Sequence, residues 1–258
     1  MSRTNWRDHD WQLIHGEPRS PALHMALDEV LVEEVAAGRR PPTLRFWEWA
    51  SSAVVIGRFQ SLRNEVDAAN AAAHGIEVVR RISGGGAMFI EPGNTITYSL
   101  YAPLSMVEGL SFEQAYAQMD AWVIAALLEL GIMAWYQPLN DITSHIGKIA
   151  GAAQARRGNA VLHHVTMAYD IDAQKMLQVL RIGREKLADK GTQSAAKRVD
   201  PLRSQTGLPR EAIIAHMIET FRHRHGLSDD TLREDEVARA QTLAASKFAN
   251  PKWTAELA

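Results

Sequence analysis

The 258-residue sequence predicts an α+β fold, in which a mixed or antiparallel sheet is flanked by helices. Strand-like segments concentrate in the first two thirds of the chain, and helical segments concentrate in the last third. The two do not alternate regularly, which argues against the repeated β-α-β units of a doubly wound sheet. The segment 147–169 also has the pattern of a long hairpin, whose two strands must run antiparallel.

The first predicted elements are one helix and two strands. Ser20 suits an N-cap and Pro21 suits the first helical position, so we expect a helix to begin there. Apolar residues then recur at helical spacing until Gly38 ends the run. The β-branched and aromatic residues of 43–49 and 53–59 predict the two strands.

The middle of the chain predicts two helices and two strands. An alanine-rich helix is expected over 65–74, followed by strands at 76–82 and 94–101. The helix over 111–130 opens on the capping-box pattern S-F-E-Q and is followed by glycine.

Three further helices complete the prediction, at 172–180, 209–225 and 229–248. The hydrophobic content of 46% is enough for one large core, or for one core plus a small lobe. We expect a single domain spanning residues 1–258.

Composition excludes several classes of protein. The formal net charge of −2 argues against a nucleic-acid-binding surface that extends over the whole protein. The absence of cysteine excludes disulfides, thiolate metal sites and a cysteine nucleophile, and it suits a reducing compartment. No apolar run is long enough to span a bilayer, and the N-terminus lacks the apolar segment of a signal peptide. The expectation is a cytoplasmic protein without membrane or nucleic-acid partners.

Residues 80–90 read R-R-I-S-G-G-G-A-M-F-I, so three glycines follow a strand directly. The stretch does not match a P-loop, and M-F-I continues as a strand instead of opening the helix of a dinucleotide fingerprint. Backbone N–H groups in such a turn can form an anion-binding nest. Successive strand residues point to opposite faces, so only one of Arg80 and Arg81 can face a ligand, and the other is structural or solvated. The alternative is a tight hairpin turn with two solvated arginines.

A lysine stands among small residues in the later segment N-D-I-T-S-H-I-G-K-I-A-G-A-A-Q. Lys148 lies between Gly147 and Gly151, and its compact charge suits a phosphate or carboxylate oxygen. The alternative is an ordinary exposed strand lysine. Asn140 and Asp141 form either a turn pair, which the sequence favours, or a carboxylate site associated with Mg²⁺.

Taken in order, these segments resemble the lipoate–protein ligase family. The resemblance rests on M-A-L-D-E, L-R-F-W-E-W, V-V-I-G-R-F-Q, R-R-I-S-G-G-G-A-M-F with P-G-N-T-I-T-Y-S, N-D-I, G-K-I-A-G-A-A-Q and L-H-H-V-T-M. It extends from about residue 11 to the C-terminus. It implies the catalytic fold that this family shares with biotin ligases and class II aminoacyl-tRNA synthetases.

The resemblance also implies an activity. The family joins lipoate to ATP, with Mg²⁺, to give lipoyl-adenylate and pyrophosphate. It then passes the lipoyl group to a lysine of an acceptor lipoyl domain, such as that of an E2 subunit or the glycine cleavage H protein. The implied ATP contacts are Arg81, Gly85, Gly86, Ala87, Met88, Phe89 and Lys148. The implied lipoate contacts are Lys148, Gly84, Gly151 and His164, with Lys148 as the catalytic residue and Asp141 as a candidate for Mg²⁺.

The sequence departs from the family pattern at three points. Ile149 stands where a second lysine is usual, and Val165 stands where glycine is usual after the two histidines. The chain is also expected to lack the C-terminal accessory domain of many bacterial ligases, so a separate small subunit is expected to assist. Related octanoyl- and lipoyl-transferases work through a cysteine thioester, a route that this sequence cannot use. The remaining alternatives are a cysteine-independent transferase and a non-catalytic protein that binds lipoate or the acceptor domain.

Basic residues also gather late in the chain, at Arg156, Arg157, Lys186, Lys190, Lys197, Arg198 and Arg203. The ordinary interpretation is a solvated surface, and the functional alternative is a docking patch for an acidic acceptor domain.

Overall fold

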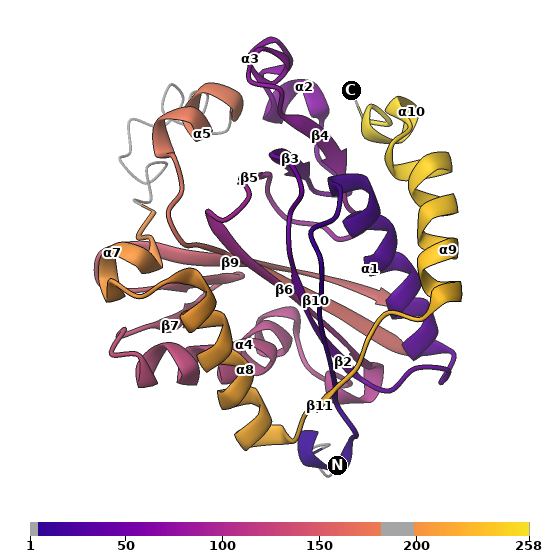
Figure 1. Ribbon diagram of the computed structural model, residues 1–258, viewed down its shortest axis with the longest axis vertical. Coiled ribbons are helices and arrows are strands. Elements are labelled where there is room, and N and C mark those ends of the chain that lie inside the picture. Colours follow the sequence, from indigo (N-terminus) through magenta and orange to yellow (C-terminus); the bar gives the residue numbers. More distant parts are fainter. Residues whose placement is uncertain (1–4, 182–198, 258) are drawn as a thin grey trace.

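An eight-stranded sheet runs through the centre of the computed structural model, which describes residues 5–181 and 199–257 (Figure 1). The strand order is β11-β1-β2-β6-β10-β9-β8-β7. The strands are β1 (Gln12–His15), β2 (Thr43–Trp47), β6 (Thr95–Pro103), β7 (Trp135–Gln137), β8 (Asp141–Thr143), β9 (Lys148–Arg157), β10 (Ala160–Ala168) and β11 (Ser228–Asp229). Strand β1 runs parallel to β2 and β11, and the other neighbours run antiparallel. The predicted mixed sheet and the hairpin of β9 and β10 are confirmed.

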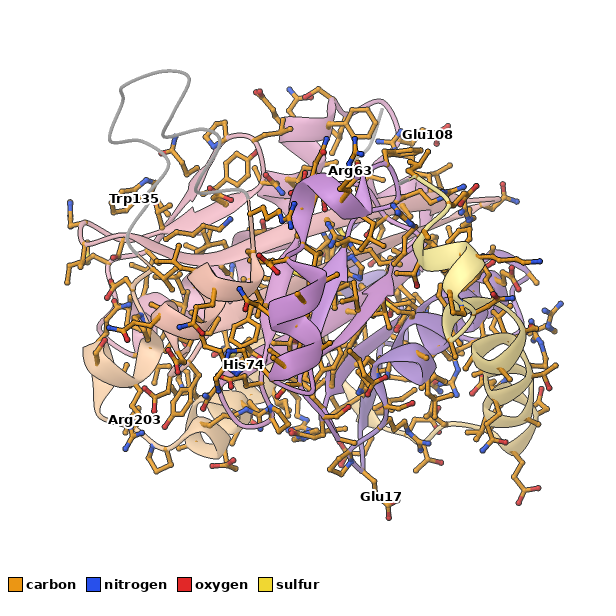
Figure 2. All side chains as sticks on the ribbon, turned by 90° about the horizontal axis from the view of Figure 1, so that it is seen from above. Glu17, Arg63, His74, Glu108, Trp135 and Arg203 are labelled. Atoms are coloured by element: carbon orange, nitrogen blue, oxygen red, sulfur yellow. The ribbon has the colours of Figure 1, made fainter. Side chains whose placement is uncertain are left out.

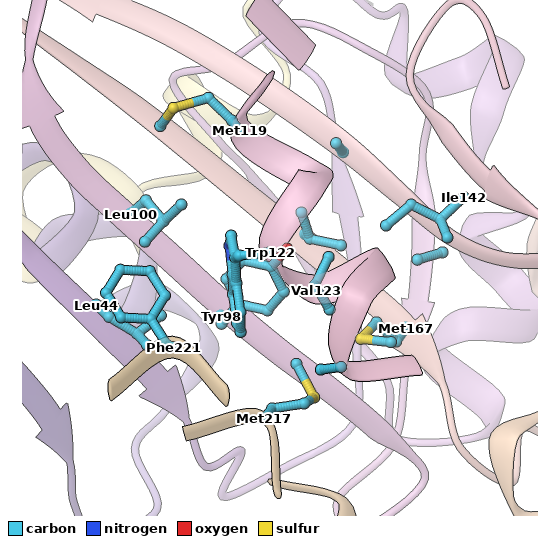
Figure 3. Packing of buried hydrophobic residues seen from close by; sticks show 14 of the residues in the cluster. Leu44, Tyr98, Leu100, Met119, Trp122, Val123, Ile142, Met167, Met217 and Phe221 are labelled. Atoms are coloured by element: carbon cyan, nitrogen blue, oxygen red, sulfur yellow. The ribbon is translucent and has the colours of Figure 1, made fainter. Parts of the chain in front are cut away.

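Helices cover both faces of this sheet. One face packs against α4 (Phe112–Glu129) and α8 (Arg210–His225), with Trp122 of α4 between Tyr98 and Phe221 at ring separations of 5.0 Å (Figure 3). The other face packs against α1 (Pro21–Ala36), which is covered in turn by α9 (Glu234–Leu243) and the π-helical turn η4 (Ala244–Phe248). The sheet thus has two apolar layers, one on each face, as the α+β prediction requires.

A second, three-stranded sheet lies beside the first, with the order β4-β3-β5. Its strands are β3 (Ala53–Ile56), β4 (Glu77–Arg80) and β5 (Met88–Ile90), and the short helices α2 (Leu62–Glu65), α3 (Ala68–Ala73) and α5 (Ala173–Val179) accompany it. Strands β3 and β4, α3 and α5 share a small apolar cluster around Ile56 and Val179. Seen from above in Figure 2, Arg63 and His74 lie on the part formed by α2 and α3.

The glycine-rich stretch connects two strands that do not pair with each other. Strand β4 runs parallel to β3 and pairs with one of its edges, and β5 runs antiparallel to β3 and pairs with the opposite edge. Residues 81–87 therefore cross the end of β3 instead of closing a hairpin. The tight-hairpin alternative is wrong for this stretch, because β3 separates the two strands.

Two helix predictions need correction. The predicted helix at 65–74 is two short helices, because Val66 is extended and Asp67 caps a new helix by accepting from the Asn70 N–H. The predicted helix at 229–248 begins only at Glu234, because Ser228 and Asp229 pair with β1. The remaining predicted elements are present, and the capping box of α4 makes both of its hydrogen bonds.

The remaining elements are short. They are η1 (Trp6–Asp8), η2 (Leu104–Met106), α7 (Leu202–Thr206) and α10 (Pro251–Thr254). None of the described helices is both long and apolar enough to cross a membrane.

Arg80 fastens the end of the chain to the second sheet. Its buried guanidinium donates to the carbonyls of Gly57 (3.0 Å) and Gln60 (2.7 Å) on one side and Thr254 (2.7 Å) on the other. The Trp253 indole returns a hydrogen bond to the Arg80 carbonyl at 2.9 Å. The structural role that the sequence allowed for one of the two arginines therefore belongs to Arg80.

Replacing Arg80 by lysine should lower the free energy of unfolding by about 2 kcal/mol or more, because an ammonium cannot reach carbonyls on both sides. Hydrogen exchange measured by mass spectrometry should also accelerate in α10. Arg63→Lys on the exposed surface of α2 is the matched control and should change stability by less than about 0.5 kcal/mol. Equal stability of the two variants would contradict this role for Arg80.

Candidate functional site

Two stretches of backbone come unusually close where the glycine turn crosses the end of β3. A Cβ atom on Gly57 would lie 2.2 Å from the Gly85 carbonyl oxygen, so no other residue fits at position 57. Gly85 itself has φ +91°, and a Cβ there would lie 2.9 Å from an Arg81 nitrogen. Sequence reasoning singled out Gly85 and missed Gly57, although V-V-I-G-R-F was one of the segments that carried the family resemblance.

Arg81 lies behind this turn and holds its carbonyl groups. The guanidinium donates to Gly84 O at 2.6 Å and to Gly86 O at 2.9 Å through one terminal nitrogen, and to Val55 O at 3.3 Å through the other. Arg81 is 2% exposed, and no carboxylate of the described residues forms an ion pair with it. Burial lowers the pKa of Arg81 to about 10, because the charged form loses its hydration.

The backbone N–H groups of the glycine turn are not used within the protein. In the part of the chain that the structure describes, no protein atom accepts a hydrogen bond from the N–H groups of residues 84–87. Gly85 and Gly86 are exposed. A turn with its carbonyls bound from behind and its N–H groups open is the arrangement expected of an anion-binding nest.

Lys148 lies at the start of β9, where the ladder is irregular. Thr143 pairs with Lys148 and Ile142 pairs with Ala150, so Ile149 is the extra residue of a bulge. Bulges redirect side chains. Here Ile149 points into the core at 1% exposure, and the Lys148 ammonium passes close to Gly151, where a Cβ atom would lie 3.0 Å away. This explains why an apolar residue is accommodated directly after the lysine.

The Lys148 ammonium forms an ion pair with Asp141 at 2.7 Å, and the lysine side chain is 34% exposed. The expected turn geometry applies to Asn140, which lies in the turn between β7 and β8, while Asp141 begins β8.

Among the described residues, no group of three or more histidine, aspartate or glutamate side chains could hold a metal. The single carboxylate of Asp141 fits a Mg²⁺ ion only if phosphate oxygens and water supply the other ligands, which is how Mg²⁺ commonly binds with nucleotides.

A cavity of about 170 Å³ connects these two segments. Ala87, Met88 and Phe89 of the glycine segment line it together with Lys148 and Gly151. The rest of its wall is mainly apolar and comes from β9, β10, α5 with its flanking residues, and the segment that bridges to Lys148: Ile149, Ala150, Thr166, Ala168, Ile171, Met176, Leu180 and Val199. The structure thus brings together most residues that the resemblance assigned to ATP. Arg81, Gly85 and Gly86 do not line the cavity, and their direct contacts with ATP stay predictions.

The two adjacent histidines face opposite sides of the large sheet. His163 lies on the α4 side, 2.7 Å from Asp120, and His164 lies on the α1 side, 2.7 Å from Asp28. The second ring nitrogen of His164 lies 2.6 Å from the Ser83 hydroxyl, so both of its nitrogens already have protein partners. A contact between His164 and lipoate stays a prediction, and it could involve only the carbon atoms of the ring. Sequence reasoning missed Asp28 and Ser83 as partners, although both lie within segments quoted for the resemblance.

The structure describes three of the seven residues of the proposed basic docking patch. Lys186, Lys190, Lys197 and Arg198 lie outside the described residues. Arg203 pairs with Asp170, and Arg156 lies over the exposed Phe112 ring with 5.2 Å from its guanidinium carbon to the ring centre.

Comparison with known proteins connects this geometry with lipoyl metabolism. Among relatives, the chain is 29% identical over 237 residues to a Mycoplasma genitalium protein named "Probable lipoate-protein ligase A", covering 91% of this chain and 68% of the relative. It is 25% identical over 273 residues to the octanoyltransferase LipM of Lysinibacillus sphaericus, covering 94% and 98%.

Two solved structures share the whole fold. One belongs to a study of a bipartite lipoate protein ligase and its E2 lipoyl domain from Thermoplasma acidophilum, with a TM-score of 0.81, 26% identity and 96% of both chains covered. The other is a lipoate-protein ligase A bound with ATP, with a TM-score of 0.82, 25% identity and coverage of 96% and 99%. The family model described as the lipoyl protein ligase A/B catalytic domain matches residues 20–222. The chain therefore belongs to the lipoyl protein ligase A/B catalytic domain family.

Proposed function

We propose that this protein is the catalytic chain of an ATP-dependent lipoate–protein ligase. It activates lipoate as lipoyl-adenylate and transfers the lipoyl group to a lysine of an acceptor lipoyl domain. The observation that carries the proposal is that one cavity is lined both by Lys148 and by Ala87, the last residue of the glycine turn, whose N–H groups at residues 84–87 have no acceptor among the described residues. Similarity to a ligase solved with ATP supports the nucleotide assignment.

The first step joins two anions, so repulsion between them is the main obstacle. A lipoate carboxylate oxygen attacks the α-phosphorus of ATP, and the bond to the β-phosphate oxygen breaks as pyrophosphate leaves. Lys148 lies at the cavity edge with a compact charge that can contact the carboxylate and the α-phosphate together. The N–H groups of the turn donate to phosphate oxygens without reorientation, which favours the charged transition state.

Asp141 keeps the Lys148 ammonium in place before substrates arrive. At 2.7 Å and partly exposed, this ion pair is weak enough for the lysine to exchange towards an incoming anion. Bound Mg²⁺ supplies charge neutralisation on the phosphates. In the second step the acceptor amine attacks the carbonyl carbon of the mixed anhydride, and AMP leaves with the bonding electron pair.

The transferase alternative is less well supported. Transfer through a thioester requires a cysteine, and the sequence contains none. The similarity to an octanoyltransferase therefore supports the shared family and acyl-group chemistry more than it supports the thioester mechanism.

The Lys148→Met variant should lose at least about 100-fold in the rate of lipoyl-adenylate formation, because the two anions lose the charge between them. Mass spectrometry after incubation with ATP, Mg²⁺ and lipoate, in the presence of the separate small subunit that is expected to assist, measures the adenylate. Lys247→Met is the matched control, since Lys247 also pairs with a carboxylate, Glu29 at 2.6 Å, but lies on the α1–η4 side. Adenylate formation by Lys148→Met at a rate near that of the control would refute the assigned role.

Alanine at two neighbouring glycines should separate folding from nucleotide binding. Gly85→Ala strains a left-handed backbone and should destabilise the free protein by about 1–3 kcal/mol. Gly86→Ala meets no atom within 4 Å and should leave stability nearly unchanged. It should nevertheless weaken ATP binding roughly tenfold, because its methyl group obstructs hydrogen bonds to the phosphates. Unchanged ATP affinity of Gly86→Ala in calorimetry would contradict the phosphate site.

We also propose that a separate small subunit completes the enzyme, supported by the similarity to a chain of a bipartite ligase. The purified chain alone should then form little adenylate, and addition of the second subunit should restore it. Full lipoylation of an acceptor domain by the chain alone would show that no second subunit is needed.

A further inference from the structure

A continuous row of hydrogen bonds leads from helix α1 to Arg81. Asp28 Oδ2 lies 2.7 Å from His164 Nδ1, and His164 Nε2 lies 2.6 Å from Ser83 Oγ. Ser83 Oγ in turn accepts from Arg81 Nε at 3.0 Å. All four residues are less than 5% exposed, so the row runs through the protein interior.

The direction of every proton in this row follows from chemistry. Asp28 Oδ1 accepts from Ser99 at 3.0 Å and from Tyr101 at 2.5 Å, so this carboxylate acts as an acceptor and His164 Nδ1 carries a proton. Burial lowers the pKa of His164, which keeps the ring neutral at pH 7 and leaves Nε2 as an acceptor. The Ser83 hydroxyl therefore donates to His164, and its oxygen lone pairs are directed towards Arg81.

Arg81 needs this contact in order to keep one orientation. Its other partners are neutral carbonyls, and the only alternative acceptor for Nε among the described residues is Gly84 O at 3.1 Å. Without Ser83 in its present rotamer, the guanidinium could rotate about its last bonds and release Gly86 O. The turn would then lose the hydrogen bonds from Arg81 that fix the orientation of the Gly84 and Gly86 carbonyls, and with them the orientation of its N–H groups.

We propose that Asp28 and His164 are positioning residues, which act through Ser83 and Arg81 to hold the glycine turn in its phosphate-binding conformation. This inference rests on the proposed function for its effect on ATP, but the ordering of Arg81 belongs to the free protein. Neither residue has to touch a substrate to act in this way.

The neighbouring histidine provides a matched control. His163 precedes His164 on β10, is equally buried and also lies 2.7 Å from an aspartate, Asp120. Its other ring nitrogen lies 3.0 Å from Gln154 Nε2, so its hydrogen bonds do not lead to Arg81. Loss of a buried histidine–aspartate pair is therefore common to His163→Gln and His164→Gln, and only the second variant interrupts the row.

The first measurement is the NMR signal of the Arg81 Nε–H in the free protein. It should be protected from exchange in the wild type and in His163→Gln, and it should be lost in His164→Gln and in Ser83→Ala. Ser83→Ala removes only a hydroxyl and serves if the histidine variant folds poorly. A protected signal in Ser83→Ala would overturn the proposal, whether or not the protein binds ATP.

The second measurement is MgATP affinity by calorimetry. His164→Gln and Ser83→Ala should each weaken binding about tenfold, whereas His163→Gln should stay within about twofold of the wild type. The double variant Ser83→Ala/His164→Gln should be no weaker than either single variant, because both interrupt one row. Additive losses, or equal losses in both histidine variants, would overturn the proposal. If the wild type does not bind MgATP, the proposed function is refuted. The NMR signal of the Arg81 Nε–H then tests the positioning role by itself.

Discussion

The geometry of the site depends on one buried guanidinium that is surrounded by carbonyl oxygens instead of a carboxylate. Arg81 donates to the Gly84 and Gly86 carbonyls of the glycine turn and to the Val55 carbonyl of β3, while the N–H groups of residues 84–87 have no acceptor among the described residues. A carboxylate beside Arg81 would neutralise the charge and leave the carbonyls free to rotate. Neutral acceptors keep the positive charge uncompensated near the turn, which favours an anion on its open side. The close approach of Gly57 and Gly85 then leaves the backbone no room to relax.

The adjacent arginines show how one strand end serves two purposes. Arg80 and Arg81 point to opposite sides, as alternation along a strand requires. Arg80 ties the second sheet to the C-terminal segment through Thr254, and Arg81 orders the turn. Both arginines donate to backbone carbonyls. Two adjacent residues therefore fix the path of the backbone around β3, Arg80 on the side of the C-terminal segment and Arg81 on the side of the glycine turn. Of the three glycines, Gly85 is the one that this path requires, because its φ is +91° and a Cβ atom there would lie 2.9 Å from an Arg81 nitrogen.

The sequence was sufficient to predict the α+β class, the long hairpin and most helices, because capping residues and apolar periodicity are local signals. It did not predict β1, β7, β8 and β11, which are two to four residues long and are stabilised by their neighbours in the sheet. The candidate residues Lys148, Ala87, Met88 and Phe89 do meet at one cavity. The contacts of Ser83 and Asp28 with His164 could not be read from spacing, since they join segments 81 and 136 residues apart. The bulge at Ile149 could not be predicted either, because the register between two strands depends on how they pair and not on the sequence of one strand alone.

The two cations of the site differ in a way that suits a reaction between two anions. Lys148 is partly exposed, on a flexible side chain, and is balanced by a single carboxylate at 2.7 Å. Exchange of that partner for a substrate oxygen costs little, so the ammonium can follow the carboxylate and the α-phosphate as their bond forms. Arg81 is buried, and it is held by neutral carbonyls and by the Ser83 hydroxyl, which His164 links to Asp28. A group held in this way cannot follow a substrate, but it can keep a binding surface unchanged throughout the reaction. A movable charge at the reacting atoms and a fixed charge behind the phosphate-binding turn are therefore complementary, and neither residue could replace the other.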